Sequence, residues 1–394
     1  MRVVVAGAGI AGLVTAIGLH RAGIEVTVLE RAPELAPAGA GISLFGNGLT
    51  GLAAVGLADQ VRALGGRASP SVRGGLRTPD GRWLTSSTDV TGEVQVVHRA
   101  DLQRVLLEAL PADLVRLGVE VAAVDLSSGG VVVRDADGSA VAEGDLLVGA
   151  DGTGSAVRSI AFGDPGLRYA GWVAWRGITS GPFGVDAIGE TWGRGRLFGI
   201  TLLGDGRVYW FAGARVPAAG RGVAGDGGAG EPPGTELRRR FGRWHRPIPA
   251  LIDATDDGAL LRHEIRTLAR PLGSYVTGRA VLVGDAAHPM TPNLGQGGNQ
   301  AIEDAVTLAR MVARAAGPGG AASPRPDLDR TLSGYDAVRR KRVEPIVRRS
   351  ALLGRLALAS RPAAVRVRNL ALRAAPSSSA TRVARALQRW QPPP

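Results

Sequence analysis

The segment that most constrains the fold lies at the N-terminus. Residues 2–30 read RVVVAGAGIAGLVTAIGLHRAGIEVTVLE, and this pattern predicts a buried strand, a glycine-rich turn, a helix and a second strand that ends at Glu30. Two strands joined by one helix in so few residues form a parallel pair, because the helix carries the chain back to the same end of the sheet. The sequence therefore predicts an α/β domain that begins with the first residues of the chain.

The turn in this unit carries the spacing G-x-G-x-x-G at Gly7, Gly9 and Gly12. Between a strand and a helix, the first glycine permits a tight turn, the second lets backbone amides approach a pyrophosphate, and the third allows the helix to pack on the sheet. An acid at the end of the second strand, in this chain Glu30, can hold ribose hydroxyls. These residues predict a dinucleotide-binding site. The same spacing recurs in residues 225–230 without a strand before it or a helix after it, so we interpret that copy as a flexible loop.

Length and composition limit the classes of protein to be considered. The chain has 394 residues, enough for two or three packed units, and 58 of them are glycine, as expected if several loops approach ligands closely. It contains no cysteine, which excludes disulfides, thiolate metal sites and redox dithiols, and no other metal site is predicted. No signal segment or membrane-spanning run is recognised, so a cytoplasmic location is expected.

The net charge of +12 is concentrated toward the C-terminus. From Arg339 onward there are 14 basic residues and a single acid, Glu344, whereas the rest of the chain is near neutral. We interpret this segment as a solvated basic surface, with contact to an anionic membrane or partner surface as the alternative. No basic pattern interleaved with aromatic residues is present, so no nucleic-acid partner is predicted.

Three further motifs follow the glycine turn along the chain. Arg99 directly precedes an apolar periodic helix of residues 100–110. A buried strand ends at Asp151 and Gly152, and a later one ends at Asp285. A carboxylate at a strand end accepts hydrogen bonds from sugar or ribityl hydroxyls, and the amides of a glycine loop stabilise negative charge. The three motifs therefore extend the predicted cofactor site.

In order and spacing these motifs, above all GDAAHPMTPNLGQGGNQAIEDA at residues 284–305, resemble the group A flavoprotein monooxygenases, the family of p-hydroxybenzoate hydroxylase, salicylate hydroxylase and zeaxanthin epoxidase. The resemblance spans roughly residues 1–345 and implies a tightly but non-covalently bound FAD. It implies that Glu30 and the glycine turn hold the ADP half, that Asp285 binds the ribityl chain and that Pro292 lies by the flavin ring. The residues that it assigns to FAD are Gly7, Gly9, Ile10, Ala11, Gly12, Glu30, Arg31, Arg99, Val124, Asp151, Gly152, Asp285, Pro292, Gly295, Gly297, Gly298 and Asn299.

The resemblance also implies the reaction. NADPH or NADH would bind transiently and reduce FAD, because the chain has no second dinucleotide-binding unit. O2 would then form a C4a-hydroperoxyflavin, which hydroxylates or epoxidises an aromatic, polycyclic or alkene small molecule in natural-product tailoring or aromatic catabolism. The protein mainly places the substrate and excludes water. The candidate catalytic residues are Arg176 and Pro292; Trp210 and Phe211 are candidates for the substrate pocket, although alternation along a strand lets only one of them face it.

Two inserts interrupt the predicted FAD-binding domain. Residues 67–97 and 164–274 alternate between apolar and polar, which predicts an antiparallel β-sheet that forms a substrate-binding domain. Within it, Asp205 and Gly206 predict a hairpin with a primed turn. The expected fold class is thus an α/β composite. Its Rossmann-like FAD-binding domain comprises residues 1–66, 98–163 and 275–318, and a C-terminal helical segment covers 325–394, with less regular structure expected beyond about Arg361.

Two other functions remain open at this stage. A flavin-dependent reductase or dehydrogenase of a lipid-like substrate would use the same cofactor site without inserting oxygen. A non-catalytic binding protein on the same fold would lose the flavin-cradling loop, and the retention of Asp285 and residues 295–298 argues against it. His288 is expected to have a packing and hydrogen-bonding role, with proton transfer as the alternative. Glu303 and Asp304 are expected to lie in the first turn of a helix that begins near residue 299, where carboxylates favour the helix dipole.

Overall fold

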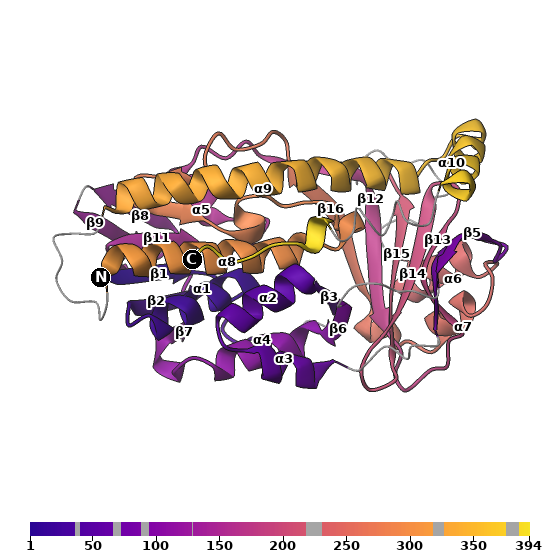
Figure 1. Ribbon diagram of the computed structural model, residues 1–394, viewed down its shortest axis with the longest axis horizontal. Coiled ribbons are helices and arrows are strands. Elements are labelled where there is room, and N and C mark those ends of the chain that lie inside the picture. The colour runs from indigo at the N-terminus through magenta and orange to yellow at the C-terminus, as the bar shows by residue number, and fades with distance from the viewer. Residues whose placement is uncertain are drawn as a thin grey trace.

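The structure is a computed structural model that describes residues 1–35, 40–65, 72–87, 94–127, 129–217, 231–317, 327–375 and 386–394. The glycine-rich copy at residues 225–230 lies outside these ranges. The molecule is elongated: an α/β part is built around one sheet, a second sheet stands beside it, and the long helix α9 (Leu328–Ala357) runs along both (Figure 1). Among the described helices, none is long and apolar enough to cross a membrane.

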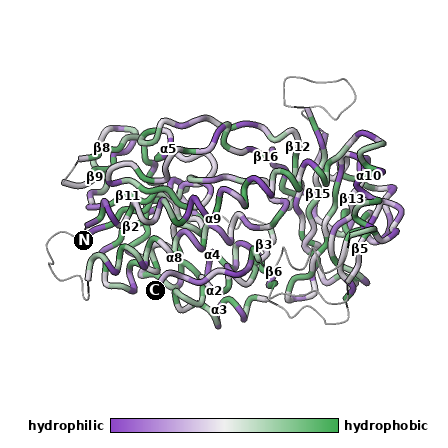
Figure 2. Tube along the Cα trace, turned by 45° about the horizontal axis from the view of Figure 1, so that its top comes forward, coloured by the Kyte–Doolittle hydropathy of each residue, from purple (hydrophilic) through white to green (hydrophobic). Residues whose placement is uncertain are grey.

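The α/β part contains a six-stranded sheet in the order β17-β18-β11-β1-β2-β7. The unit predicted at the N-terminus is confirmed, because β1 (Arg2–Ala6) and β2 (Glu25–Glu30) pair in parallel with α1 (Ile10–Arg21) between them. Hydrophobic residues run along the central strands (Figure 2), and those of β1 and β11 are buried, as expected for parallel strands covered by helices. The other strands are β7 (Val115–Leu117), β11 (Leu146–Gly149), β17 (Val276–Thr277) and β18 (Ala280–Leu282).

Helices pack on this sheet and on each other. α8 (Gly297–Ala316) lies so close to α1 that a Cβ on Gly18 would be 2.7 Å from the Cβ of Ala309. α9 packs on α8 in turn. The smaller elements of this part are β3 (Gly41–Phe45) paired with β6 (Val94–His98), the antiparallel strands β8 (Ala123–Ser127), β9 (Gly130–Arg134) and β10 (Ala140–Gly144), and the helices α2 (Gly46–Ala54), α3 (Ala58–Leu64), α4 (Arg99–Glu108) and α5 (Ala156–Ala161).

The second sheet has seven strands in the order β16-β12-β15-β14-β13-β4-β5. Its neighbouring strands are antiparallel except β13 and β4, which run parallel, so the prediction of a wholly antiparallel sheet is wrong at this pair. The two strands of this pair come from different inserts. One face, with Trp175, Phe198 and Trp210, packs on α6 (Pro233–Phe241) and α7 (Ile248–Asp253). The strands are β4 (Arg73–Arg77), β5 (Trp83–Ser87), β12 (Leu167–Ile178), β13 (Ala187–Trp192), β14 (Arg196–Leu202), β15 (Val208–Arg215) and β16 (Leu261–Leu268).

The hairpin between β14 and β15 has a different turn from the predicted one. A type I′ turn needs a positive φ at both central residues, but Gly206 alone has one in this turn, at 82°. The Gly206 amide donates to the carbonyl oxygen of Leu203 (3.2 Å), and the side chain of Asp205 accepts from the amide of Arg207 (3.0 Å). The loop is therefore a type I turn followed by a left-handed glycine.

Regular structure continues past Arg361, where less of it was expected. α10 spans Pro362–Ala374, and its proline stands at the first helical position, where no backbone N–H is needed. Arg368 fastens this helix, because its guanidinium donates to the carbonyl oxygens of Gly193 (3.3 Å) and Ala357 (2.8 Å). The end of α9 is thereby tied to the end of β13.

Candidate functional site

A cavity of about 500 Å³ lies between the α/β part and one face of the second sheet, within the size range of small-molecule sites. Its α/β wall consists of the glycine turn, the start of α4 and the loop between β18 and α8, and its other wall comes from strands β12 to β15. This is the edge where the carboxyl ends of the parallel strands meet, the usual place for ligands in such sheets. The predicted site residues that line the cavity are Gly9, Ile10, Ala11, Arg99, Gly152, Arg176, Phe211, Asp285, Pro292, Gly295, Gly297 and Gly298.

The three glycines of the N-terminal turn differ in their surroundings. Gly7 has a φ of +105°, and a Cβ there would lie 2.6 Å from the carbonyl oxygen of Ala150. A Cβ on Gly12 would lie 1.9 Å from the carbonyl oxygen of Gly7. A Cβ on Gly9, which lines the cavity, would meet no protein atom within 4 Å. Gly7 and Gly12 are therefore required by the packing of the protein itself, whereas the space beside Gly9 is available to a ligand.

Glu30 is joined to the glycine turn by hydrogen bonds. Its carboxylate accepts from the amide of Ala8 (2.8 Å) and from that of Ala32 (3.0 Å). Each oxygen keeps a further lone pair, so the group can also accept from ribose hydroxyls. Glu30 and Arg31 stand at the end of β2 and Val124 lies in β8, and none of the three lines the cavity.

The loop after β18 brings the start of a helix to the cavity. Gly295, with a φ of +62°, ends the short helical turn Pro292–Leu294, and α8 then begins at Gly297. Gly297 and Gly298 line the cavity. Because the first amides of a helix have no partner within the helix, they offer hydrogen-bond donors and the positive end of the helix dipole to a ligand.

Two predicted cofactor residues have side chains that bond within the protein. The amide of Asn299 is buried and donates to the carbonyl oxygens of Ser43 (3.0 Å) and Gly295 (2.9 Å), so it joins the loop to β3 and does not line the cavity. Asp151 accepts from the amide of Val157 through Oδ2 (3.0 Å). Its Oδ1 is buried and has no hydrogen-bond partner among the described residues. An oxygen of this kind is available to a ligand hydroxyl or amide.

Two arginines bring positive charge into the cavity. Arg99 begins α4 and Arg176 lies in β12, and both line the cavity. Burial lowers the pKa of Arg99, the charge of Asp285 raises it, and the charge of Arg176 lowers it. Burial and the same two arginine charges also lower the pKa of His263 on β16. The cavity therefore suits a ligand that carries or develops negative charge.

Alternation along β15 separates the two candidate pocket residues. Phe211 lines the cavity. Trp210 points to the opposite face, where it is fully buried, stacks on Phe198 and donates from Nε1 to the hydroxyl of Thr255 (2.8 Å). Trp210 is therefore a core residue and not part of the pocket.

Two polar residues that line the cavity from the second sheet were not predicted from the sequence: Glu190 on β13 and Tyr209 on β15. Burial raises the pKa of Glu190 above its usual value of 4.5, although a hydrogen bond from Trp192 Nε1 (2.6 Å) acts to lower it. Burial also raises the pKa of Tyr209. No local motif marks either residue, because a polar side chain in an alternating strand usually predicts a solvated face. A buried acid with a raised pKa in a cavity is typical of a functional site.

A buried charge network lies behind the loop. Because α8 begins at Gly297, Glu303 and Asp304 fall beyond its first turn, contrary to the prediction, and both are fully buried. Arg339 of α9 is also fully buried and donates to Glu303 (2.8 Å) and to Asp304 (2.6 Å). His288 Nε2 donates to Asp304 (2.6 Å). These contacts agree with structural roles for the three predicted residues, since they join the loop, α8 and α9.

The residues of the cavity fit FAD. The open space beside Gly9 suits a pyrophosphate, which binds where backbone amides come close. Asp151 lies between the lining residues Ala150 and Gly152; it does not line the cavity itself, but its unpartnered oxygen can accept one more hydrogen bond. The amides of Gly297 and Gly298 at the start of α8 suit the edge of a ring system that becomes negative on reduction.

Comparison with known proteins agrees with this geometry. A family model described as an FAD binding domain matches residues 1–165 and 262–350. Aurachin C monooxygenase/isomerase of Stigmatella aurantiaca is 40% identical over 366 residues, which cover 90% of this chain and 89% of that protein. An FAD-dependent urate hydroxylase of Klebsiella pneumoniae is 34% identical over 359 residues, which cover 88% of each chain. The crystal structure of Klebsiella pneumoniae HpxO with FAD and uric acid matches with a TM-score of 0.85 at 30% identity, covering 98% of this chain and 96% of that one.

Proposed function

The chain belongs to the family of FAD-dependent aromatic monooxygenases, and on that premise we propose that it transfers one oxygen atom of O2 to a small aromatic substrate with NADPH or NADH as the electron donor. An aromatic C–H becomes C–OH, the nicotinamide loses a hydride, a proton is consumed, and the second oxygen atom leaves as water. The chemistry supplied by bound FAD is electron transfer from the nicotinamide to O2. One observation carries the proposal: a single cavity is lined by Asp285 and Pro292 on one wall and by Arg176 and Glu190 on the other.

We assign the cofactor to the α/β wall. The glycine turn and Glu30 would hold the ADP half, with Arg31 and Val124 beside it, and Asp151 would accept a hydrogen bond from the cofactor through its free oxygen. Asp285 would accept from the ribityl hydroxyls. The amides of Gly297 and Gly298 would stabilise negative charge at the pyrimidine edge of the ring system.

We assign the substrate to the sheet wall. Trp172, Tyr209 and Phe211 line this wall and provide an aromatic surface that packs on a flat ring and excludes water. Arg176 would favour the ionised form of a phenol or related ring, which is richer in electrons and reacts faster with an electrophilic oxygen. Glu190 would accept a hydrogen bond from a ring N–H or hydroxyl and so fix which carbon atom faces the cofactor.

The proposal is tested by following NADPH and NADH oxidation by the purified holoprotein in air, with a panel of phenols, polycyclic aromatics and nitrogen heterocycles. We expect substrate-stimulated oxidation and, by mass spectrometry, a product heavier by one oxygen atom that derives from isotopically labelled O2. Oxidation that proceeds equally well without O2, or a product that differs only by two hydrogens, would indicate a reductase or dehydrogenase instead. A colourless protein that cannot be reconstituted with FAD would indicate a binding protein.

Glu190→Gln is expected to raise KM for the substrate severalfold, up to about tenfold, while leaving substrate-free NADPH oxidation unchanged, because a hydrogen bond contributes about 0.5–1.5 kcal/mol. Glutamine keeps the size of the side chain and a carbonyl oxygen that can accept from Trp192. Glu264→Gln is the matched control, since Glu264 lies on the same sheet but does not line the cavity. Steady-state kinetics check the result, and an unchanged KM would remove Glu190 from substrate binding.

The same variant has a second readout in the pH dependence of stability. Because burial raises the pKa of Glu190, the folded protein keeps this proton to a higher pH than the unfolded chain. Ionisation of Glu190 therefore lowers the free energy of unfolding as the pH rises from about 4.5 through the raised value. Urea unfolding at a series of pH values should show a smaller loss in Glu190→Gln over this window. Parallel profiles for the two proteins would count against the raised pKa.

A further inference from the structure

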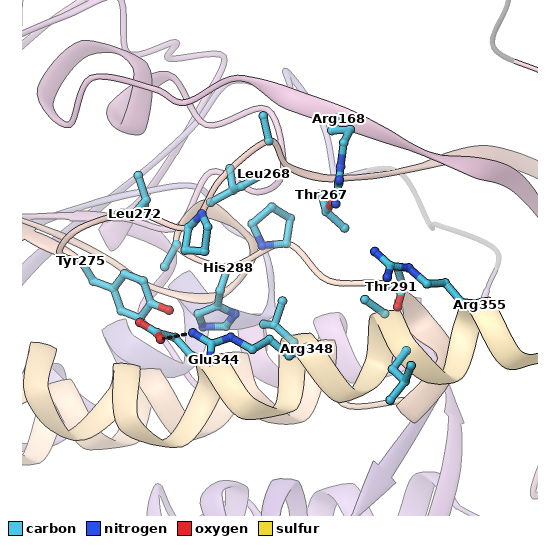
Figure 3. Close-up of a pocket in the computed structure, with 17 residues that line it drawn as sticks. Arg168, Thr267, Leu268, Leu272, Tyr275, His288, Thr291, Glu344, Arg348 and Arg355 are labelled. Carbon is cyan, nitrogen blue, oxygen red and sulfur yellow. Dashed lines mark hydrogen bonds and ion pairs between the residues drawn. The ribbon is translucent and has the colours of Figure 1, made fainter.

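A second cavity of about 330 Å³ shares the loop that follows β18 with the first cavity. Met290 and Pro292 of this loop line the first cavity, whereas His288, Pro289 and Thr291 line the second. The remaining walls come from the end of β16, the turn after it, and α9 (Figure 3). None of its lining residues has a role in binding the cofactor or the substrate in the proposed function.

The walls of the second cavity are apolar. Leu268 and Leu272 form one side of it. Val347 and Ala351, four residues apart and therefore on the same face of α9, form the other. Leu352 also lines the cavity and is 66% exposed. These walls suit the apolar body of a ligand.

One buried polar atom at this cavity lacks a partner. His288 is 4% exposed, and its Nε2 is bonded to Asp304, but its Nδ1 has no hydrogen-bond partner among the described residues. Tyr275 lines the same end of the cavity, with its ring centroid 5.7 Å from that of His288. Because buried polar atoms are nearly always hydrogen-bonded, the free nitrogen of His288 can form one further hydrogen bond, with a water molecule at this end of the cavity.

The rim of the second cavity is positively charged. Arg168 of β12 and Arg348 and Arg355 of α9 line it, and Figure 3 shows the side chains of Arg168 and Arg355 directed toward the same opening. In the part of the chain that the structure describes, neither Arg168 nor Arg355 makes a side-chain hydrogen bond or ion pair. The one acid of the lining, Glu344, is already paired with Arg340 (3.0 Å) and Arg348 (3.1 Å). Two guanidinium groups are thus free to bind an anion at the mouth of an apolar cavity.

We propose that the second cavity binds an organic carboxylate with an apolar body, of the size of a medium-chain fatty acid. The carboxylate lies at the rim against Arg168 and Arg355, because a planar guanidinium binds a carboxylate through two parallel hydrogen bonds. The chain packs between the leucines of the β16 side and Val347 and Ala351 of α9. The ligand is a regulator rather than a substrate, since its site lies apart from the cavity assigned to the cofactor.

Binding in the second cavity is coupled to the first through the shared loop. His288 and Pro289 contact the ligand, and the next residues along the chain, Met290 and Pro292, line the cofactor cavity. A ligand that packs on this loop restricts its motion and so changes the surroundings of the cofactor. A small shift of the visible absorption of FAD on ligand addition is therefore expected in addition to binding itself.

The experiment measures decanoate binding to the holoprotein by titration calorimetry, with 1-decanol as the neutral ligand of equal chain length. We expect one decanoate to bind per chain. Decanol should bind at least about tenfold more weakly than decanoate. The double variant Arg168→Gln/Arg355→Gln should weaken decanoate binding about tenfold or more. Arg349→Gln is the matched control, because Arg349 is an exposed arginine of α9 that lines neither cavity, and it should bind decanoate like the parent.

A second variant tests the apolar wall without changing charge. Ala351→Leu fills the space between α9 and the β16 side, and leucine is a good helix former, so the fold and the FAD content should be preserved while decanoate binding is lost. Decanoate that binds equally well to Ala351→Leu and to the double arginine variant occupies another site, and this result would overturn the proposal. Equal affinity for decanoate and decanol in the parent would overturn it as well. Neither outcome depends on turnover, so each is separate from the test of the proposed function.

Discussion

Replacing Arg339 with methionine is expected to lower the free energy of unfolding by about 3–5 kcal/mol, because it leaves buried carboxylates without their main counter-charge. Arg339 is fully buried on α9 and donates to Glu303 and to Asp304 on α8. After the substitution, Glu303 keeps an ion pair with Arg342 (3.0 Å) and Asp304 keeps its hydrogen bond from His288. The expected loss therefore comes mainly from the desolvated charge that remains, and less from the removal of one hydrogen bond.

Urea unfolding of the holoprotein at neutral pH measures this loss. Lys341→Met is the matched control, since it removes a positive charge two residues away at an exposed position of the same helix and should change stability by no more than about 0.5 kcal/mol. Equal unfolding midpoints for Arg339→Met and Lys341→Met would show that the two buried acids are not ionised. FAD content should also fall in Arg339→Met, because Asp304 accepts a hydrogen bond from the amide of Gly284 (2.8 Å) at the base of the cofactor loop.

Gly9→Ala is expected to fold like the parent and yet to bind FAD roughly tenfold to hundredfold more weakly, the effect of a methyl group forced into a close contact. A Cβ at this position meets no protein atom within 4 Å, so only a ligand can collide with it. Gly12→Ala should fail differently. Its Cβ would lie 1.9 Å from a backbone oxygen of the turn, so the apoprotein itself should lose stability and FAD should be lost with it.

Thermal unfolding of the apoproteins and FAD binding during reconstitution separate these two outcomes. Gly273→Ala serves as the control, because a Cβ there also meets no atom within 4 Å but the residue lies outside the cavity. It should match the parent in both measurements. If Gly9→Ala binds FAD as tightly as the parent, the cofactor does not approach the turn, and the assignment of its pyrophosphate to this loop fails.

The α/β part was predictable because its signals are local. Strand, turn and helix follow one another within residues 2–30, and each of the three glycines of the turn has a structural role. The loop that follows β18 was predictable for the same reason. Its clustered glycines indicate a backbone that a ligand can approach closely. Where a motif is contiguous, the sequence predicts the element that it forms.

The rest of the site depends on neighbours that are far away in the sequence. Asn299 bonds to Ser43, 256 residues earlier, and no local pattern announces this pairing. Glu190 and Tyr209 line the cavity only because β13 and β15 take up a particular place in the seven-stranded sheet. Less regular structure was expected at α10 because Pro362 suggests a break, whereas at the first position of a helix a proline is favourable. Tertiary position, which residue type does not encode, decided the cases of Asn299, Glu190 and Tyr209.

The strand order of the first sheet has a consequence for synthesis on the ribosome. Val3 of β1 pairs with Leu146 of β11. The apolar strand β1 is synthesised first and therefore has no β11 to pair with until much later in translation. At 5–20 residues per second this interval lasts on the order of ten seconds. During it the nascent chain exposes an unpaired hydrophobic edge of the kind that chaperones recognise. The nascent chain is therefore exposed to aggregation during this interval, and added chaperones should increase the soluble yield of the protein.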